Sequence, residues 1–101
     1  MALTIIWTEQ ATKELDYILN YWNDRIGTTD YSIRLVSLFD KTLNTLSSLP
    51  KTGKETDNRQ IRYRIVKDYF LFYSYDDSAL YVVDICDMRR DPTYIRSLLQ
   101  T

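Results

Sequence analysis

Histidine is absent from this 101-residue sequence, and cysteine, glycine and proline are scarce, with one, two and two residues. The lone Cys86 cannot form an internal disulfide, and without histidine it has no partner for a zinc site or a Cys–His catalytic pair. The sequence also contains no glycine-rich phosphate loop and no nucleophile elbow. We therefore expect no metal site, no cofactor and no conventional hydrolytic enzyme.

Long hydrophobic runs are also missing. The longest apolar stretch, around Tyr69–Tyr73, is far shorter than the ~20 residues that cross a bilayer. No charged segment precedes an apolar one at the N-terminus, as it would in a secretory signal. The sequence predicts a cytoplasmic protein without membrane association. With 45% apolar residues, it also predicts a single domain over residues 1–101.

Charge is balanced overall but unevenly distributed. The formal net charge is -1, and the sequence pI is about 5.3. Residues 1–50 hold four basic side chains against six acids, whereas residues 51–67 hold six basic side chains against Glu55 and Asp57. This contrast predicts a local positive field on an otherwise acidic protein.

Apolar side chains recur with two different periods in the first half of the sequence. They alternate between Leu3 and Thr8, which is typical of a short strand. A helical period follows and ends at Gly27, because glycine commonly caps helix C-termini. Residues 28–30 can cap a second helix that runs to Pro50, and the short connection predicts an antiparallel helical hairpin. The apolar stripes are Ala11, Leu15, Ile18, Leu19, Trp22 and Ile26, and then Leu35, Val36, Leu38, Phe39, Leu43, Leu46 and Leu49.

The second half is predicted to contain three strands and a short helix. Residues 51–60 are polar without any period, which indicates an exposed loop. The strands Ile61–Ile65, Tyr69–Tyr75 and Leu80–Asp87 are joined by short turns, which favours an antiparallel meander. A last helix would start at Asp91 and turn Ile95, Leu98 and Leu99 inward. The order β-α-α-β-β-β-α predicts an α+β domain with the helical hairpin packed on one face of a single sheet.

A cluster of basic residues is the candidate binding site. Arg62 and Arg64 stand two apart in a predicted strand, so both project from one face, with Ile61, Tyr63 and Ile65 turned to the core. Other lysines and arginines could join them in a basic concavity that binds phosphates or acidic protein segments. The alternative is a solvated polar face on which the arginines pair with acids such as Asp84 and Asp87. The candidate residues are Lys51, Lys54, Arg59, Arg62, Arg64, Arg89 and Arg90.

The end of the sequence resembles that of a known family. Residues 83–92 read Val-Asp-Ile-Cys-Asp-Met-Arg-Arg-Asp-Pro, a hydrophobic strand that runs into a polar residue, a spacer, two arginines and a proline. This pattern, together with the element order and the arginine-bearing strand, resembles the RelE/ParE superfamily of bacterial toxins over nearly the whole chain. The resemblance implies the growth-inhibiting, plasmid-stabilising toxin of a type II toxin-antitoxin system, held inactive by a cognate antitoxin in a heterotetramer or another complex.

Two activities are known in that superfamily. RelE-like members cleave messenger RNA on the ribosome without a metal, and ParE-like members inhibit DNA gyrase. By position, Arg62, Arg64 and Arg90 match basic residues of the RNA-cleaving type and would hold the scissile phosphate. Tyr94 is similar to a C-terminal tyrosine and would carry a proton.

Three departures favour the ParE-like activity. Phe70 stands where RNA-cleaving members usually have an arginine to stabilise phosphorane charge, and Asp87 stands where they often have histidine. The pI of about 5.3 is low for a protein that binds ribosomes. The resemblance therefore implies a gyrase inhibitor, with a ribosome-dependent endoribonuclease and an inactive, antitoxin-binding member as alternatives.

Overall fold

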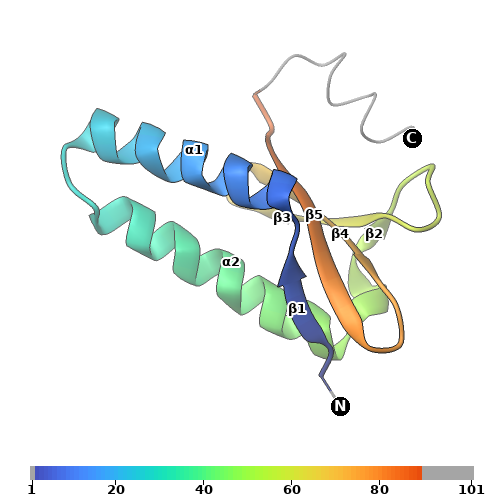
Figure 1. Cartoon of the computed structure of the whole chain (residues 1–101). Helices are drawn as coiled ribbons and strands as arrows, with labels where there is room; N and C mark the ends of the chain where they lie inside the picture. The colour runs from blue at the N-terminus through green and yellow to red at the C-terminus, as the bar shows by residue number, and fades with distance from the viewer. Residues whose placement is uncertain (1, 90–101) are drawn as a thin grey trace.

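The chain folds as a helical hairpin packed on one face of a five-stranded sheet (Figure 1). The structure is a computed structural model and describes residues 2–89. The predicted α+β class, the order of the first six elements and the antiparallel meander are confirmed; the predicted helix from Asp91 lies outside the described residues. The elements are β1 (Thr4–Trp7), α1 (Glu9–Ile26), α2 (Asp30–Ser48), the 3-10 helix η1 (Pro50–Thr52), β2 (Lys54–Glu55), β3 (Arg62–Val66), β4 (Tyr69–Tyr75) and β5 (Ala79–Asp87).

Local capping explains where α1 begins and ends. The Thr8 side chain accepts a hydrogen bond from the amide of Ala11 and satisfies a free donor of the first turn. At the other end, Gly27 has a φ of 84°, and its amide donates to the carbonyl of Asn23. Glycine adopts this left-handed conformation without steric cost, so it ends the helix and turns the chain back toward α2.

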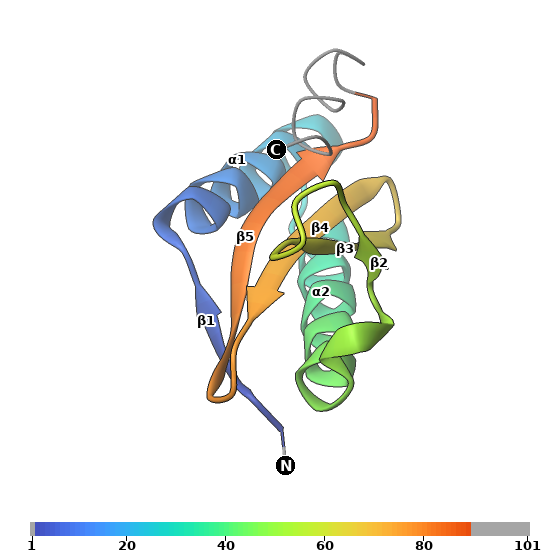
Figure 2. The same cartoon turned by 90° about the vertical axis from the view of Figure 1, so that its right-hand side faces the viewer.

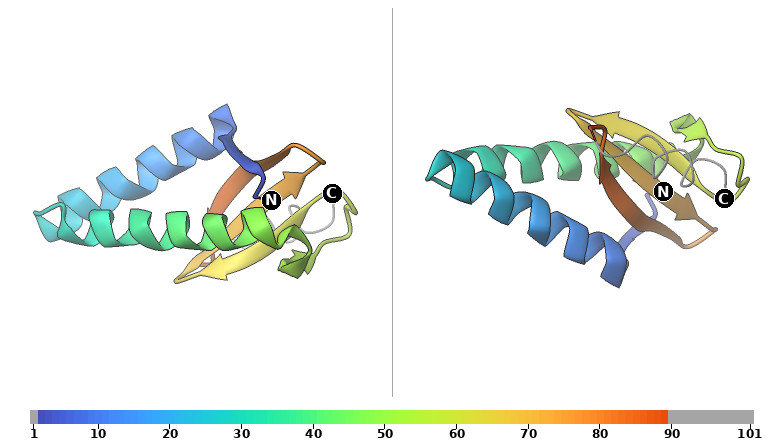
Figure 3. Two further views of the ribbon diagram at one scale, coloured as in Figure 1. Left: turned by 90° about the horizontal axis from the view of Figure 1, so that it is seen from below. Right: turned by 90° about the horizontal axis from the view of Figure 1, so that it is seen from above.

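The two helices lie together on the same side of the strands (Figure 3). Buried Ser32 joins them, because its hydroxyl donates to the Leu19 carbonyl and to the Asn23 side chain. Their joined ends extend beyond the strands, and residues 24–30 are all exposed (Figure 1). The hairpin therefore covers the sheet with the part away from the connection between the helices, and the connected ends lie in solvent. Among the described residues, no helix is both long and apolar enough to cross a membrane.

The sheet has the strand order β1-β5-β4-β3-β2, with β5 between β1 and β4 (Figure 2). β1 is parallel to β5, and every other neighbouring pair is antiparallel. A register shift between Phe72 and Tyr73 marks a bulge in the β4–β5 pair. The helix-facing side of these strands is the core, where Leu71, Tyr73 and Ile85 are fully buried against the hairpin.

The predicted direction of the β3 side chains is wrong. Arg62 and Arg64 pair with Tyr73 and Leu71, so they lie on the helix-facing side of the sheet. Ile65 is 45% exposed, and Tyr63 lies on the opposite face. Alternation alone suggested that the apolar residues face the core. Near the sheet edge, however, arginine stems can cover apolar surface while their charged heads reach outward.

The opposite face of the sheet carries an aromatic cluster. The Tyr63 ring is 5.5 Å from that of Phe70 and 6.0 Å from that of Phe72. The segment predicted as a loop, residues 51–60, also contains structure, because β2 adds two residues to the edge of β3. A two-residue strand has no detectable alternation, so its pairing could not be seen in the sequence.

Candidate functional site

Arg62 binds the chain segment that connects α2 to β3. Its guanidinium donates to the carbonyls of Lys51 and Gly53 at 3.1 and 2.9 Å, and to a Glu55 carboxylate oxygen at 3.2 Å. Only 18% of the Arg62 side chain is exposed. Arg64 donates to the Thr52 hydroxyl at 3.0 Å. Both arginines therefore fasten η1 and β2 to the sheet.

The hydroxyl of Tyr73, on β4, holds the same segment through two further hydrogen bonds. It donates to the Pro50 carbonyl at 2.6 Å and accepts from the Gly53 amide at 3.0 Å. Its ring is fully buried, and this burial raises the pKa of Tyr73 above its ordinary value, although the Gly53 amide and the nearby arginines oppose the rise. The bond to the Pro50 carbonyl requires the phenolic proton, so the neutral tyrosine acts here as a structural anchor.

The other basic candidates of this region are Lys51, Lys54 and Arg59. All three are exposed, and within residues 2–89 none of them forms an ion pair. Lys51 and Lys54 belong to the anchored segment, and Arg59 lies in the loop that follows it. A polyanionic partner would meet these three side chains first, because Arg62 and Arg64 already use donors on the protein.

Arg89 lies elsewhere, beyond the end of β5. It forms a two-point ion pair with Asp87, with 2.9 Å from Nη2 to Oδ2 and 3.1 Å from Nε to Oδ1. This carboxylate raises the pKa of Arg89 above its ordinary value, first through the hydrogen bonds and then through its charge. Acids such as Asp84 and Asp87 were the alternative partners predicted for Arg62 and Arg64; in the structure Asp87 pairs with Arg89, and Arg62 pairs with Glu55.

The structure does not place Arg89 beside Arg62 and Arg64. Arg62 pairs with Tyr73 at one end of β4, whereas Asp87 pairs with Tyr69 at the other. Four residues of strand separate the two positions by about 13 Å. The single basic concavity expected from the sequence is therefore divided into two sites. Arg90 and Tyr94 lie outside the described residues.

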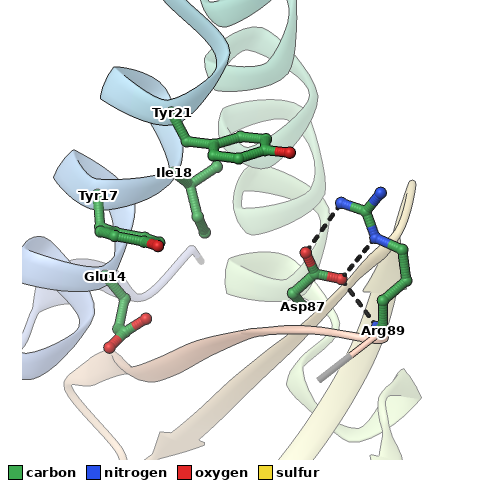
Figure 4. A pocket seen from close by; sticks show the side chains of 6 residues that line it. All are labelled: Glu14, Tyr17, Ile18, Tyr21, Asp87 and Arg89. Carbon is green, nitrogen blue, oxygen red and sulfur yellow. Dashed lines mark hydrogen bonds and ion pairs between the residues drawn. The ribbon is translucent and has the colours of Figure 1, made fainter. Parts of the chain in front are cut away.

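A cleft of about 300 Å³ opens between α1 and the end of β5 (Figure 4). Asp87 and Arg89 form one wall, and α1 supplies the other. Tyr17 and Tyr21 are 69% and 41% exposed, so aromatic surface faces the ion pair across the cleft. The lining residues are Glu14, Tyr17, Ile18, Tyr21, Asp87 and Arg89.

The α1 wall is held in place by an internal hydrogen bond. Trp22 donates from Nε1 to the Tyr69 hydroxyl at 2.7 Å, and the Tyr21 ring meets Trp22 edge-on at 5.2 Å. Burial raises the pKa of Tyr69, an effect that the Trp22 hydrogen bond partly opposes. Since Tyr69 is the strand partner of Asp87, this bond ties the two walls together.

Polar and aromatic groups of this kind suit recognition of another protein. In the described part of the chain, no group of three or more metal-binding side chains gathers. The sequence analysis did not single out Tyr17 and Tyr21. Their spacing of four residues, outside the apolar stripe of α1, was the available signal, because two aromatics placed in this way share an exposed helix face.

Comparison with known proteins places these features in context. The family model described as the ParE toxin of the type II toxin-antitoxin system parDE matches residues 5–92. A solved structure titled "Chromosomal ParDE TA system from P. aeruginosa" is similar in fold, with a TM-score of 0.71 and 14% sequence identity. The match covers 87% of this chain and 98% of that one. No curated protein matches the sequence.

Proposed function

We propose, because the chain belongs to the ParE family of type II toxin-antitoxin toxins, that it arrests growth by inhibiting DNA gyrase and is neutralised by a cognate antitoxin. The observation that carries the choice of target is the engagement of Arg62 and Arg64. Their donors bind carbonyls and a hydroxyl of the chain itself, which suits a structural role. A protein target would then be recognised through exposed surfaces such as the cleft beside Arg89.

The alternative activity is metal-independent cleavage of messenger RNA by Arg62, Arg64, Arg90 and Tyr94. A scissile phosphate would compete with the bonds that fasten η1 and β2 for the guanidinium groups of Arg62 and Arg64. Phe70, where RNA-cleaving relatives usually have an arginine, belongs to the aromatic cluster on the opposite face of the sheet. These contacts favour gyrase over the ribosome as the target.

The antitoxin would bind the toxin in the bacterial cytoplasm, in a heterotetramer or a related complex. A segment rich in acids and apolar residues suits a toxin whose exposed Lys51, Lys54 and Arg59 form no ion pair within residues 2–89, because it gains both charge attraction and apolar burial. The candidate contacts of the antitoxin are the exposed cations Lys51, Lys54 and Arg59 and the ion-paired Arg89.

The test of the target uses purified proteins. The chain is added to gyrase and relaxed plasmid, and supercoiling is followed on gels; in parallel, transcript ends are mapped after induction of the chain in a bacterial host. We expect inhibited supercoiling, filamentous cells and intact transcripts. Uninhibited gyrase together with transcripts cut at codons would overturn the proposal in favour of the nuclease.

A further inference from the structure

A second groove, of about 600 Å³, runs between the first half of α2 and the β3–β4 turn. Tyr31, Arg34, Leu38 and Lys41 recur at helical spacing, so they share one face of α2. Lys67, in the turn, has a φ of 56° and completes the opposite rim. The lining residues are Tyr31, Ile33, Arg34, Leu35, Ser37, Leu38, Lys41 and Lys67.

The charge of this groove is of one sign. Arg34, Lys41 and Lys67 are exposed, and none of these side chains forms an ion pair or hydrogen bond with another residue in the described range 2–89. No acid is among the described lining residues. The cleft beside Arg89 differs, because Glu14 and Asp87 line it. An acidic ligand is therefore attracted more strongly to the α2 groove than to the cleft beside Arg89.

The floor of the groove is apolar. Leu35 is 1% exposed and belongs to the core, and Tyr31 and Leu38 pack partly against it. Ile33 is 60% exposed beside them. Such a surface rewards a ligand that brings apolar side chains as well as negative charge. A nucleic acid would use the three cations but would gain little from the aliphatic residues.

We propose that this groove binds a segment of the antitoxin in which acidic residues alternate with apolar ones. This inference rests on the proposed neutralisation by an antitoxin and adds where the segment binds. Its apolar side chains cover Leu38 and Ile33, while its carboxylates pair with Arg34, Lys41 and Lys67. The pairs at the rim hold the register of the segment and accelerate its association at low salt.

The test compares two double variants that carry the same change in charge. Arg34→Glu with Lys67→Glu reverses two cations of the groove, and Lys13→Glu with Arg25→Glu reverses two exposed cations on α1. Binding of the purified antitoxin encoded beside the toxin gene is measured by calorimetry at low and high salt. We expect affinity to fall about 10-fold or more for the groove variant and less than about 3-fold for the α1 variant.

Ile33→Ser tests the apolar contribution separately. Because Ile33 is largely exposed, this variant should keep the melting temperature of the wild type, yet bind the antitoxin less tightly at both salt concentrations. Equal affinities of the wild type and both groove variants would overturn the groove assignment and leave the proposed neutralisation intact. A wild-type chain that fails to bind this antitoxin would overturn the neutralisation itself. RNA binding that the groove double variant abolishes, with antitoxin binding unchanged, would also overturn the proposal.

Discussion

The hydroxyl of Tyr73 occupies the space where Gly53 would carry a side chain. A Cβ atom built at Gly53 would lie 2.1 Å from the Tyr73 hydroxyl oxygen, closer than two such atoms can approach. The same oxygen accepts the Gly53 amide at 3.0 Å. The φ of Gly53 is -70°, which any residue can adopt. Glycine is therefore needed here for the close approach of Tyr73 and not for its backbone conformation. This contact therefore acts together with the hydrogen bonds of Arg62 and Arg64 to hold the segment that links α2 to the edge of the sheet.

Gly53→Ala should destabilise the fold. The added methyl group must push the Tyr73 ring out of a fully buried position, and overpacking of this kind costs about 1–3 kcal/mol. Urea unfolding measures the difference in free energy. Lys51→Ala is the matched control in the same segment, because its side chain is exposed and its loss should change stability by less than ~0.5 kcal/mol. An unchanged stability of Gly53→Ala would show that the segment can move away from Tyr73.

Arg62→Ala should loosen η1 and β2 without unfolding the domain. Three hydrogen bonds are lost at a mostly buried side chain, for which we expect about 1–3 kcal/mol. Hydrogen exchange should accelerate at the Gly53 amide and stay unchanged in α1. Arg62→Lys should recover little of the lost stability, because a single ammonium cannot reproduce the planar guanidinium contacts.

The toxicity of Arg62→Ala separates a structural from a functional role. A variant that keeps native exchange rates at Gly53 but loses toxicity would assign Arg62 to the target site. We expect the reverse, with faster exchange and toxicity retained at low temperature, where the loosened fold is still populated.

Trp22→Phe should weaken the wall of the cleft beside Arg89. It removes the donor to the Tyr69 hydroxyl and leaves that buried group without this partner, at a cost of about 1–3 kcal/mol. Combining it with Tyr69→Phe in a double-mutant cycle isolates the bond itself. We expect the double variant to be less destabilised than the sum of the single ones. Additive losses would mean that the two side chains stabilise the fold independently.

Stability should fall at alkaline pH because two buried tyrosines must ionise. Burial raises the folded-state pKa of Tyr69 and Tyr73 above the unfolded value of about 10, so the folded state holds these protons more tightly. Their contribution is complete below about pH 10 and is lost as the pH rises through the folded-state pKa values.

Urea unfolding at several pH values checks this dependence. The free energy of unfolding of the wild type should decline with a steeper slope above about pH 10 than that of Tyr73→Phe, which lacks one of the two ionising groups. Tyr17→Phe is the control, because it removes the hydroxyl of a tyrosine that is 69% exposed. Identical slopes in all three proteins would contradict a raised pKa of Tyr73.

The helices and the antiparallel meander were predictable because they follow from long periodic stretches, from the glycine that ends α1 and from short turns. Gly27 ends α1 as expected, and the meander follows from short turns between apolar runs. The face of β3 was not predictable from alternation. Both Arg62 and Tyr63 have an apolar body and a polar end, so either could face the helices. The contacts that decide it come from Pro50 and Gly53, in a segment without any periodic pattern.

The candidate site was predicted only in part, for a related reason. Charge counting located the exposed cations around residue 51, but it carries no information on which arginines already have partners. The pairing of Arg89 with Asp87 depends on the strand ending at that point, and the α2 groove depends on Lys67 in a turn facing Arg34. Both arise from tertiary placement.

The position of β5 in the sheet determines when the protein can complete its fold during synthesis. Thr4 in β1 has its strand partner at Ala79 in β5, far along the chain, and β4 also pairs with β5. Until the last strand leaves the ribosome, the helical hairpin has no complete sheet to cover, and such distant pairing is slow to form. A chain interrupted before Ala79 lacks β5, the strand that joins β1 to β4, and should fail to fold. The described fold can therefore be completed only after β5 has been synthesised, and until then β1 has no neighbouring strand in the sheet.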